Sequence, residues 1–214
     1  MTRLVKGLKR GEDGVVRCWW CGDDPLYIRY HDEEWGVLLA SDQRLFEKLC
    51  LEGFQAGLSW ITILRKRENF RAAFNGFRID RVAKLTRRDV DRLLGDAGIV
   101  RHRGKIESVI NNAARMTELL AEHGSFAGFL SAFRPDEAAR PRRVTHAALS
   151  ALSQTAESKA LSRELRGRGF TYVGPTTMYA FMQSVGLVND HLHGCEVRER
   201  VAAAASSRRR PGRG

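Results

Sequence analysis

The sequence predicts an all-α fold. Apolar residues recur at helical spacing in almost every segment, Ser, Thr and Gly stand where helices begin and end, and stretches that alternate like a strand are hard to find. The chain has 214 residues, enough for one domain or two closely packed ones with a substantial core. No apolar run approaches the roughly 20 residues that span a bilayer.

The N-terminal segment, residues 1–16, is basic and contains glycine, without the apolar stretch of a secretory signal. We expect it to form a flexible extension and the protein to be cytoplasmic. The ordered part begins at Arg17. Five of the eight Trp and Tyr residues lie between positions 19 and 35. Such density is typical of a core, but these side chains also offer stacking faces with a polar edge, so both interpretations stay open.

The central stretch, residues 51–64, carries a carboxylate within an apolar helical pattern. A helix capped at Ser41-Asp42 places Glu52 near its end, a loop containing Gly57 follows, and Ser59 caps a second helix from Trp60 to about Asn69. An acid beside a large aromatic side chain could line a pocket for a flat ligand with hydrogen-bond donors. The alternative is a glutamate that caps a helix or pairs with an arginine.

Two further helices are predicted around a glycine-containing turn. Thr86 can cap residues 87–94, and the stretch 96–106 joins this segment to a helix from Lys105 to about Leu120. Such a hairpin exposes backbone N–H groups at a helix N-terminus and could bind phosphate. An ordinary helix connection with a solvated basic face explains the pattern equally well.

The C-terminal half is predicted to contain two more helices and no internal repeat. Residues 134–154 are expected to be an irregular connection, Thr155 or Ser158 begins a helix to about Arg168, and another helix runs from Thr176 to about Val185. Residues 196–214 are low in complexity, so we expect a disordered basic tail.

The formal net charge of +11 points to a polyanionic partner. Part of this charge lies in the tail, where residues 196–214 hold six arginines and two glutamates. Nucleic acid is favoured over a membrane, because no basic amphipathic helix stands out.

Four cysteines without an export signal are better explained as metal ligands or core residues than as disulfides. His191 and Cys195 are four residues apart near the C-terminus, and Cys18 and His31 lie near the N-terminus. Together they would make a tetrahedral Cys2His2 zinc site, with no open position. By spacing alone, Cys21 and His193 remain rival ligands.

Several motifs together resemble the bacterial 3-methyladenine DNA glycosylase I family over roughly residues 17–195. They are Asp24-Pro25-Leu26-Tyr27-Ile28, Tyr30-His31-Asp32, Glu34-Trp35-Gly36-Val37, Leu51-Glu52-Gly53, Gln55-Ala56-Gly57-Leu58-Ser59-Trp60-Ile61-Thr62, Asp96-Ala97-Gly98-Ile99, Arg101-His102-Arg103-Gly104-Lys105-Ile106 and Leu187-Val188-Asn189-Asp190-His191. The resemblance implies a helix-hairpin-helix DNA glycosylase fold, with the hairpin motif near residues 87–116, and release of 3-methyladenine from alkylated double-stranded DNA. A monomer is the expected state.

The resemblance also assigns residues to roles. It implies one structural zinc ion held by Cys18, His31, His191 and Cys195, joining segments 18–31 and 191–195. It implies that Glu52 hydrogen-bonds the damaged base, surrounded by Tyr30, Trp60, Tyr27, Trp20 and Trp35. From the pattern we expect Leu58 and Gln55, at the loop tip, and Gly98, Arg101, Arg103 and Lys105, on the hairpin, to contact DNA. The alternatives are a glycosylase of wider specificity and a non-catalytic, zinc-stapled DNA-binding module.

Overall fold

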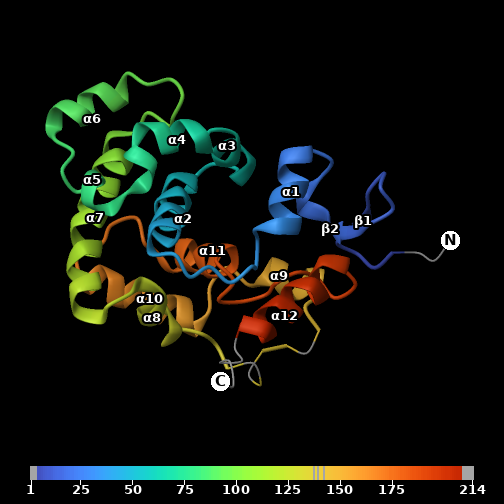
Figure 1. Cartoon of the computed structure of the whole chain (residues 1–214). Helices are drawn as coiled ribbons and strands as arrows, with labels where there is room; N and C mark the ends of the chain where they lie inside the picture. Colours follow the sequence, from blue (N-terminus) through green and yellow to red (C-terminus); the bar gives the residue numbers. More distant parts are fainter. Residues whose placement is uncertain (1–3, 137, 139, 142, 209–214) are drawn as a thin grey trace. The chain divides into compact units, whose positions relative to one another are not determined.

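The computed structural model describes residues 4–136, 138, 140–141 and 143–208, and it is mostly helical (Figure 1). The chain divides into two compact units. The first unit comprises residues 1–38, 134–153 and 182–214, and the second comprises residues 39–133 and 154–181. No helix in the described ranges is long and apolar enough to cross a membrane.

The elements of the first unit come from both ends of the chain. They are β1 Leu8–Arg10, β2 Val16–Cys18, the 3-10 helix η1 Trp19–Cys21, α1 Pro25–Glu33, α9 His146–Ala151 and α12 Glu196–Arg208.

The second unit holds most of the remaining helices. They are α2 Asp42–Gln55, α3 Trp60–Arg65, α4 Arg67–Ala73, η2 Asn75–Phe77, α5 Ile79–Val82, α6 Arg87–Leu94, α7 Arg103–His123, α8 Phe126–Ser131 and α10 Ala156–Gly167. Helix α11, Pro175–Ser184, begins in this unit and ends in the first.

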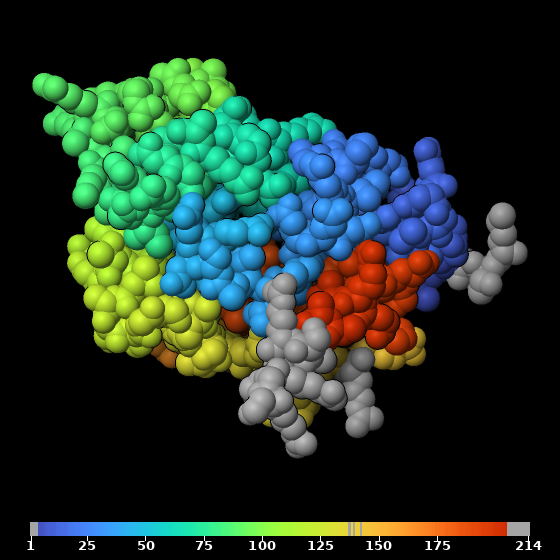
Figure 2. Space-filling view, viewed as in Figure 1, coloured from blue at the N-terminus to red at the C-terminus, as the bar shows by residue number. Residues whose placement is uncertain are grey.

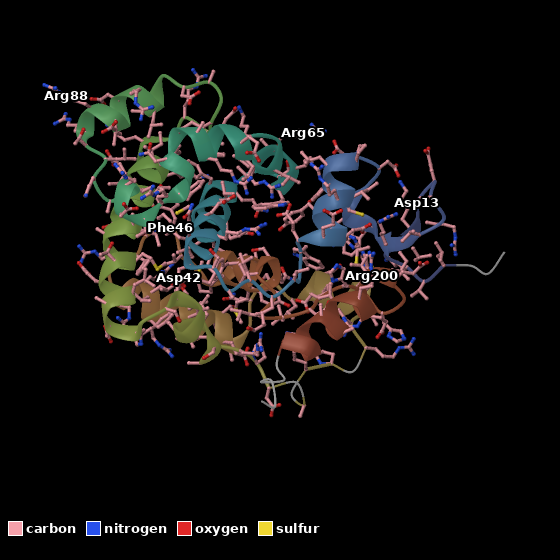
Figure 3. All side chains as sticks on the ribbon, in the orientation of Figure 1. Asp13, Asp42, Phe46, Arg65, Arg88 and Arg200 are labelled. Carbon is pink, nitrogen blue, oxygen red and sulfur yellow. The ribbon has the colours of Figure 1, made fainter. Side chains whose placement is uncertain are left out.

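Helix α2 runs through the core of the second unit and is buried from Leu45 to Phe54. It contacts α3, α7 and α8. Phe54 stacks near Phe70, with ring centroids 4.5 Å apart, and Phe46 lies beside Phe77 at 6.3 Å. The Asp42 carboxylate accepts from the backbone N–H of Phe126 at 2.9 Å, which ties the start of α2 to the start of α8. Asp42 and Phe46 are labelled in Figure 3.

Most of the predicted helices are confirmed. Ser41, Ser59, Thr86 and Thr155 occupy the N-cap positions of α2, α3, α6 and α10. Thr86 forms a capping box, since its N–H donates to the Asp89 carboxylate at 2.9 Å. Ser59 makes no cap bond, because its hydroxyl pairs with that of Thr62 at 2.7 Å.

The helix predicted from Trp60 to about Asn69 is interrupted. Lys66, with φ −95° and ψ 0°, separates α3 from α4. Its side chain donates to the carbonyls of Ala97 and Gly98, at 2.9 and 3.2 Å. The break therefore coincides with a contact to a distant segment. The spacing of apolar residues around Lys66 does not predict that contact.

The N-terminal segment differs from the expected flexible extension over residues 1–16. Strands β1 and β2 pair antiparallel, with Leu8 opposite Cys18. Gly14 takes φ +78° in the connecting turn, a conformation that favours glycine. Three-residue strands carry too little alternation for sequence patterns to detect.

The C-terminal segment was expected to be disordered, but residues 196–208 form helix α12. Val197 and Val201 are one turn apart and both are buried, in a cluster with Cys18, Leu192 and Cys195. Figure 2 shows this red helix against the blue N-terminal segment. The alanines that gave the tail low complexity also favour a helix, and residues 209–214 lie outside the described part.

The connection predicted over residues 134–154 also contains a helix, α9. Thr145 caps it by accepting from the N–H of Ala148 at 3.2 Å. The six residues of α9 are too few for a helical period to stand out.

Candidate functional sites in the two units

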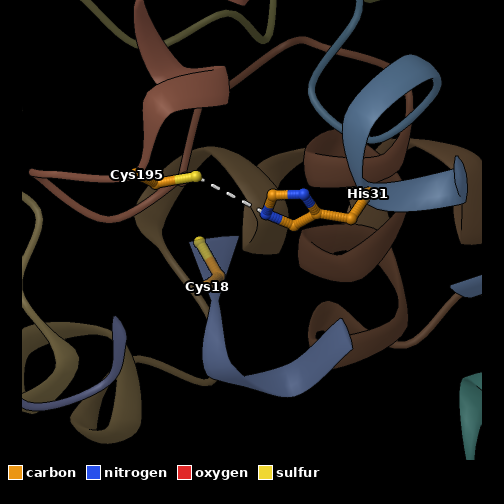
Figure 4. A group of neighbouring side chains, drawn as sticks. All are labelled: Cys18, His31 and Cys195. Carbon is orange, nitrogen blue, oxygen red and sulfur yellow. Dashed lines mark hydrogen bonds between the residues drawn. The ribbon is translucent and has the colours of Figure 1, made fainter. Parts of the chain in front are cut away.

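The first unit brings together three of the four predicted metal ligands. The Sγ atoms of Cys18 and Cys195 and a ring nitrogen of His31 all lie within 4.8 Å of one another, and all three residues are buried (Figure 4). His31 Nε2 lies 3.6 Å from Cys195 Sγ. Tetrahedral zinc with bonds of about 2.0 to 2.3 Å spaces its ligand atoms by about 3.5 Å. The three ligand atoms are therefore close enough together to share one metal ion.

The orientation of His31 is fixed by a chain of charged groups. Its Nδ1 lies 2.7 Å from the Asp32 carboxylate, which accepts from Arg17 at 2.8 to 3.0 Å, and Arg17 in turn donates to Asp13. Although burial opposes ionisation, the bonds from Arg17 and His31 hold the pKa of Asp32 below its usual range. A carboxylate behind a histidine is the usual support of a metal-bound imidazole.

The two cysteines carry unequal proton affinities. The Cys18 thiol donates to Cys195, and together with His31 this lowers the pKa of Cys195 to about 4, while the pKa of Cys18 is raised. The hydrogen bond between the two sulfurs therefore favours the thiolate form of Cys195. Thiolates are the form of cysteine that binds zinc.

The fourth predicted ligand, His191, lies beside the group with both ring nitrogens facing oxygen. Nδ1 is 2.9 Å from the amide oxygen of Asn189, whose orientation is set because its NH2 donates to the Arg198 carbonyl. Nε2 is 3.2 Å from the His31 carbonyl. Burial lowers the pKa of His191 to about 4, so the ring is neutral and one nitrogen faces an acceptor without a proton. A cation near Nε2 would satisfy it.

The rival ligands lie outside this group of three. Cys21 is buried, and its thiol donates to the Cys18 carbonyl at 3.1 Å. Burial raises the pKa of Cys21 to about 11, which keeps it protonated. His193 is exposed.

Trp20, Tyr27, Tyr30 and Trp35 form one aromatic cluster around α1. Trp20 lies 5.1 Å from Tyr27, 6.4 Å from Tyr30 and 4.9 Å from Trp35, measured between ring centroids. Trp35 also packs edge-on against His191 at 4.7 Å. Tyr30 and Trp35 are buried, whereas Trp20 and Tyr27 are half-buried. The cluster therefore supports the Cys/His group and still has partly exposed rings.

In the second unit, Glu52 lies near the C-terminal end of α2 and is only 4% exposed. Lys48 is one helical turn earlier on the same helix and is equally buried, and its Nζ lies 5.4 Å from the centre of the Trp60 ring. Trp60 begins α3 and is 7% exposed. The predicted order of helix, loop and helix is confirmed, although the second helix ends at Arg65. Lys48 is a charged neighbour that residue spacing had not indicated.

The loop between α2 and α3 carries one prominent apolar side chain. Gly57 takes φ +83°, and Leu58 next to it is 42% exposed. The N–H of Leu58 donates to the Gln55 carbonyl at 2.7 Å, which closes the loop. A large apolar residue held outward on a tight turn has the form of a wedge.

The predicted connection between α6 and α7 spans residues 95–102. Gly98 is held inside it, because its N–H donates to Asp96 at 2.7 Å and its carbonyl accepts from Lys66 and Asn69. Arg101 is exposed. Arg103 is 49% exposed and pairs with Asp91 at 2.9 Å, which raises the pKa of its guanidinium.

Lys105 differs from the expectation that it contacts DNA through its charge. The side chain is buried, and its Nζ donates to the carbonyls of Phe54 and Ala56 at 2.8 and 2.6 Å. The sequence pattern did not distinguish Lys105 from the other basic residues of the hairpin. The carbonyls at the end of α2 lack helical partners, and they take up this lysine.

Comparison with known proteins identifies the family. Residues 20–199 match the family model described as methyladenine glycosylase. The chain belongs to this family. It is 49% identical over 182 residues to DNA-3-methyladenine glycosylase 1 of Escherichia coli, covering 85% of this chain and 96% of that protein. It is 44% identical to DNA-3-methyladenine glycosylase of Haemophilus influenzae, covering 85% and 97%.

Solved structures agree with this family membership. A variant of 3-methyladenine DNA glycosylase I in complex with 3-methyladenine superimposes with a TM-score of 0.78 at 35% identity, covering 85% of this chain and 97% of the other. The predicted helical glycosylase-like fold is thereby confirmed at the level of overall architecture.

Proposed function

We propose that this chain is a base-excision repair glycosylase that flips 3-methyladenine out of alkylated double-stranded DNA and releases it by hydrolysis of the N-glycosidic bond. The observation that carries the proposal is the 49% identity to DNA-3-methyladenine glycosylase 1 of Escherichia coli across 96% of that protein. A match of this length leaves little of the relative's chain without a counterpart here.

The chemistry of the lesion sets what the enzyme must supply. Methylation at N3 makes the adenine cationic while it is attached to the sugar, and the base leaves neutral, so the leaving group is already activated. The protein has to extract the nucleotide from the stack, at a cost of a few kcal/mol, and hold the base while water attacks the sugar. The sequence and fold assign no general base for that water.

Glu52 is proposed to read the base. Its carboxylate can accept from the exocyclic amine, and its negative charge complements the cationic ring. Trp60 offers an aromatic face, and such a face stabilises a cation by about 0.5 to 2 kcal/mol. A neutral adenine gains little from either group. We also propose that the rings of Tyr30, Tyr27, Trp20 and Trp35 stack against the base.

DNA contacts are proposed for the loop and the hairpin of the second unit. Leu58 would fill the gap that the flipped nucleotide leaves, with Gln55 beside it. Arg101 and Arg103 are exposed next to the N-terminus of α7, where phosphate is favoured by the helix dipole. Gly98 would meet DNA through its backbone, since a Cβ there would lie 2.9 Å from Asp96 Oδ1. The protein is proposed to act as a monomer.

A structural zinc ion is proposed for the first unit. Cys18, His31 and Cys195 would hold it, with His191 as the fourth ligand. Zinc would supply no chemistry to the reaction, because four protein ligands leave no position for water. Metal analysis of the purified protein is expected to give zinc near a 1:1 ratio, and folded protein without metal would refute the site.

The decisive experiment for the function uses duplex DNA treated with a methylating agent. We expect incubation with the protein to release 3-methyladenine, identified by chromatography against standards. Release of other alkylated bases at comparable rates would establish a wider specificity. Binding to the DNA without release of any base would establish the non-catalytic alternative.

A further inference from the structure

Two lysines of the second unit donate hydrogen bonds to backbone carbonyls of distant segments. Lys105 Nζ donates to the carbonyls of Phe54 and Ala56 at 2.8 and 2.6 Å, and its side chain is only 8% exposed. Lys66 Nζ donates to the carbonyls of Ala97 and Gly98 at 2.9 and 3.2 Å. Neither bond is local, because the partners lie 31 to 51 residues away.

The Lys105 bonds connect the hairpin helix to the Leu58 loop. Lys105 lies in the first turn of α7, immediately after the hairpin, and its N–H is capped by His102 at 3.2 Å. Phe54 and Ala56 stand at the end of α2, just before Leu58. The end of a helix carries partial negative charge, so an ammonium there is favoured. One side chain therefore joins the hairpin to the loop.

The Lys66 bonds make a second connection, on the other side of the same loop. Lys66 lies between α3 and α4, and α3 is the helix that follows the Leu58 loop. Its partners Ala97 and Gly98 form the tip of the hairpin, where Asn69 also donates to the Gly98 carbonyl at 3.2 Å. The hairpin is thus fixed to the segments that enter and leave the Leu58 loop.

Packing alone does not explain the choice of lysine at position 105. Burying an ammonium costs free energy unless it is bonded, and burial lowers the pKa of Lys105 accordingly. A methionine of similar length would fill the same volume without that cost. What lysine adds is a directional bond to two carbonyls of a distant segment.

We propose that Lys105 and Lys66 are positioning residues. They would fix the distance between the proposed DNA-binding hairpin, residues 95–102, and the exposed side chain of Leu58. The inference rests on the proposed function, and it separates the basic residues that contact DNA from those that hold the site in place. Arg101 and Arg103 would meet phosphates, while the two lysines keep the hairpin and the wedge in register. Misplacing a group by about 1 Å can cost on the order of a hundredfold in rate, so the coupling matters for excision more than for binding.

The test compares Lys105→Met, Lys105→Arg and Lys66→Met, with Lys159→Met as the control. Lys159 is exposed on α10 and its substitution removes the same charge. Each variant is assayed for single-turnover release of 3-methyladenine from duplex DNA at saturating protein, for Kd toward that DNA, for binding of free 3-methyladenine and for Tm.

We expect Lys105→Met to release the base about 10 to 100 times more slowly, with Kd for DNA within about threefold of wild type and free-base binding unchanged. Lys105→Arg should recover part of the rate, because arginine keeps the charge and the donors. Lys66→Met should show a smaller loss of the same kind, and Lys159→Met should match wild type.

Three results would overturn the inference. They are a wild-type rate in both methionine variants, a loss confined to Kd, which would make the lysines phosphate contacts, and a parallel loss of free-base binding. If Lys105→Met does not fold, the Lys66→Met variant provides the test by the same criteria, because Lys66 is half-exposed. Failure of the wild-type protein to release 3-methyladenine would instead refute the proposed function, so the two failures are distinct.

Discussion

Asp32 accepts a hydrogen bond from Nδ1 of His31 at 2.7 Å, so the opposite ring nitrogen faces Cys195. Asp32→Asn removes the charge behind the imidazole, and we expect zinc to bind about 10 to 100 times more weakly. Competition with a chromophoric chelator measures the affinity. Asp13→Asn is the matched control, because Asp13 also binds Arg17 but does not touch His31. Equal zinc affinities in the two variants would contradict the role of Asp32.

Glu52→Gln keeps the shape of the side chain and removes its charge. A hydrogen bond to a charged group contributes about 1.5 to 3 kcal/mol, so excision of 3-methyladenine should slow about 10- to 150-fold. Single-turnover release from methylated duplex measures the effect. Glu47→Gln, on the same helix, is the control, because Glu47 is paired with Arg71 at 2.8 Å. Near-wild-type turnover in Glu52→Gln would exclude an essential role for its charge.

Leu58→Ala shortens the proposed wedge. The exposed position predicts an unchanged Tm, whereas release of 3-methyladenine from duplex DNA should fall about tenfold, since partial unstacking of DNA costs a few kcal/mol that the wedge offsets. Leu152→Ala, another exposed leucine, serves as the control. Normal binding and excision by Leu58→Ala would eliminate this role.

Val201→Ala tests whether helix α12 belongs to the folded protein. The substitution removes two methyl groups at a position that is 5% exposed, so the free energy of unfolding should fall by about 2 kcal/mol. Denaturant titration measures it, with Ala203→Ser on the exposed face of α12 as the control. An unchanged midpoint in Val201→Ala would mean that this helix adds no stability.

Local patterns were sufficient to place Glu52 on its helix and to locate most helix starts. The reason is that caps such as Thr86 and Thr155 and the period of apolar residues around Leu45 act over a few positions only. The grouping of Cys18, His31 and Cys195 is also as expected, with residues drawn from both the N-terminal and the C-terminal segment.

Contacts between distant residues could not be predicted in this way. From the sequence, Lys105 is predicted to be an exposed charge. Only the structure shows that the carbonyls of Phe54 and Ala56 lie beside it. Val201 looks like one apolar residue in an alanine-rich tail until the buried cluster around Cys18 is known. In both cases the deciding partner is far away in the sequence, and composition carries no information about it.

The N–H of Val16 donates to the carboxylate of Glu196, 180 residues later in the chain. At the usual pace of translation, about 5 to 20 residues per second, strand β2 waits roughly 10 to 35 s for this partner to be made. Residues 39–133 of the second unit are complete long before then. The first unit must therefore finish folding late in synthesis, and Cys18 and His31 wait as long for Cys195.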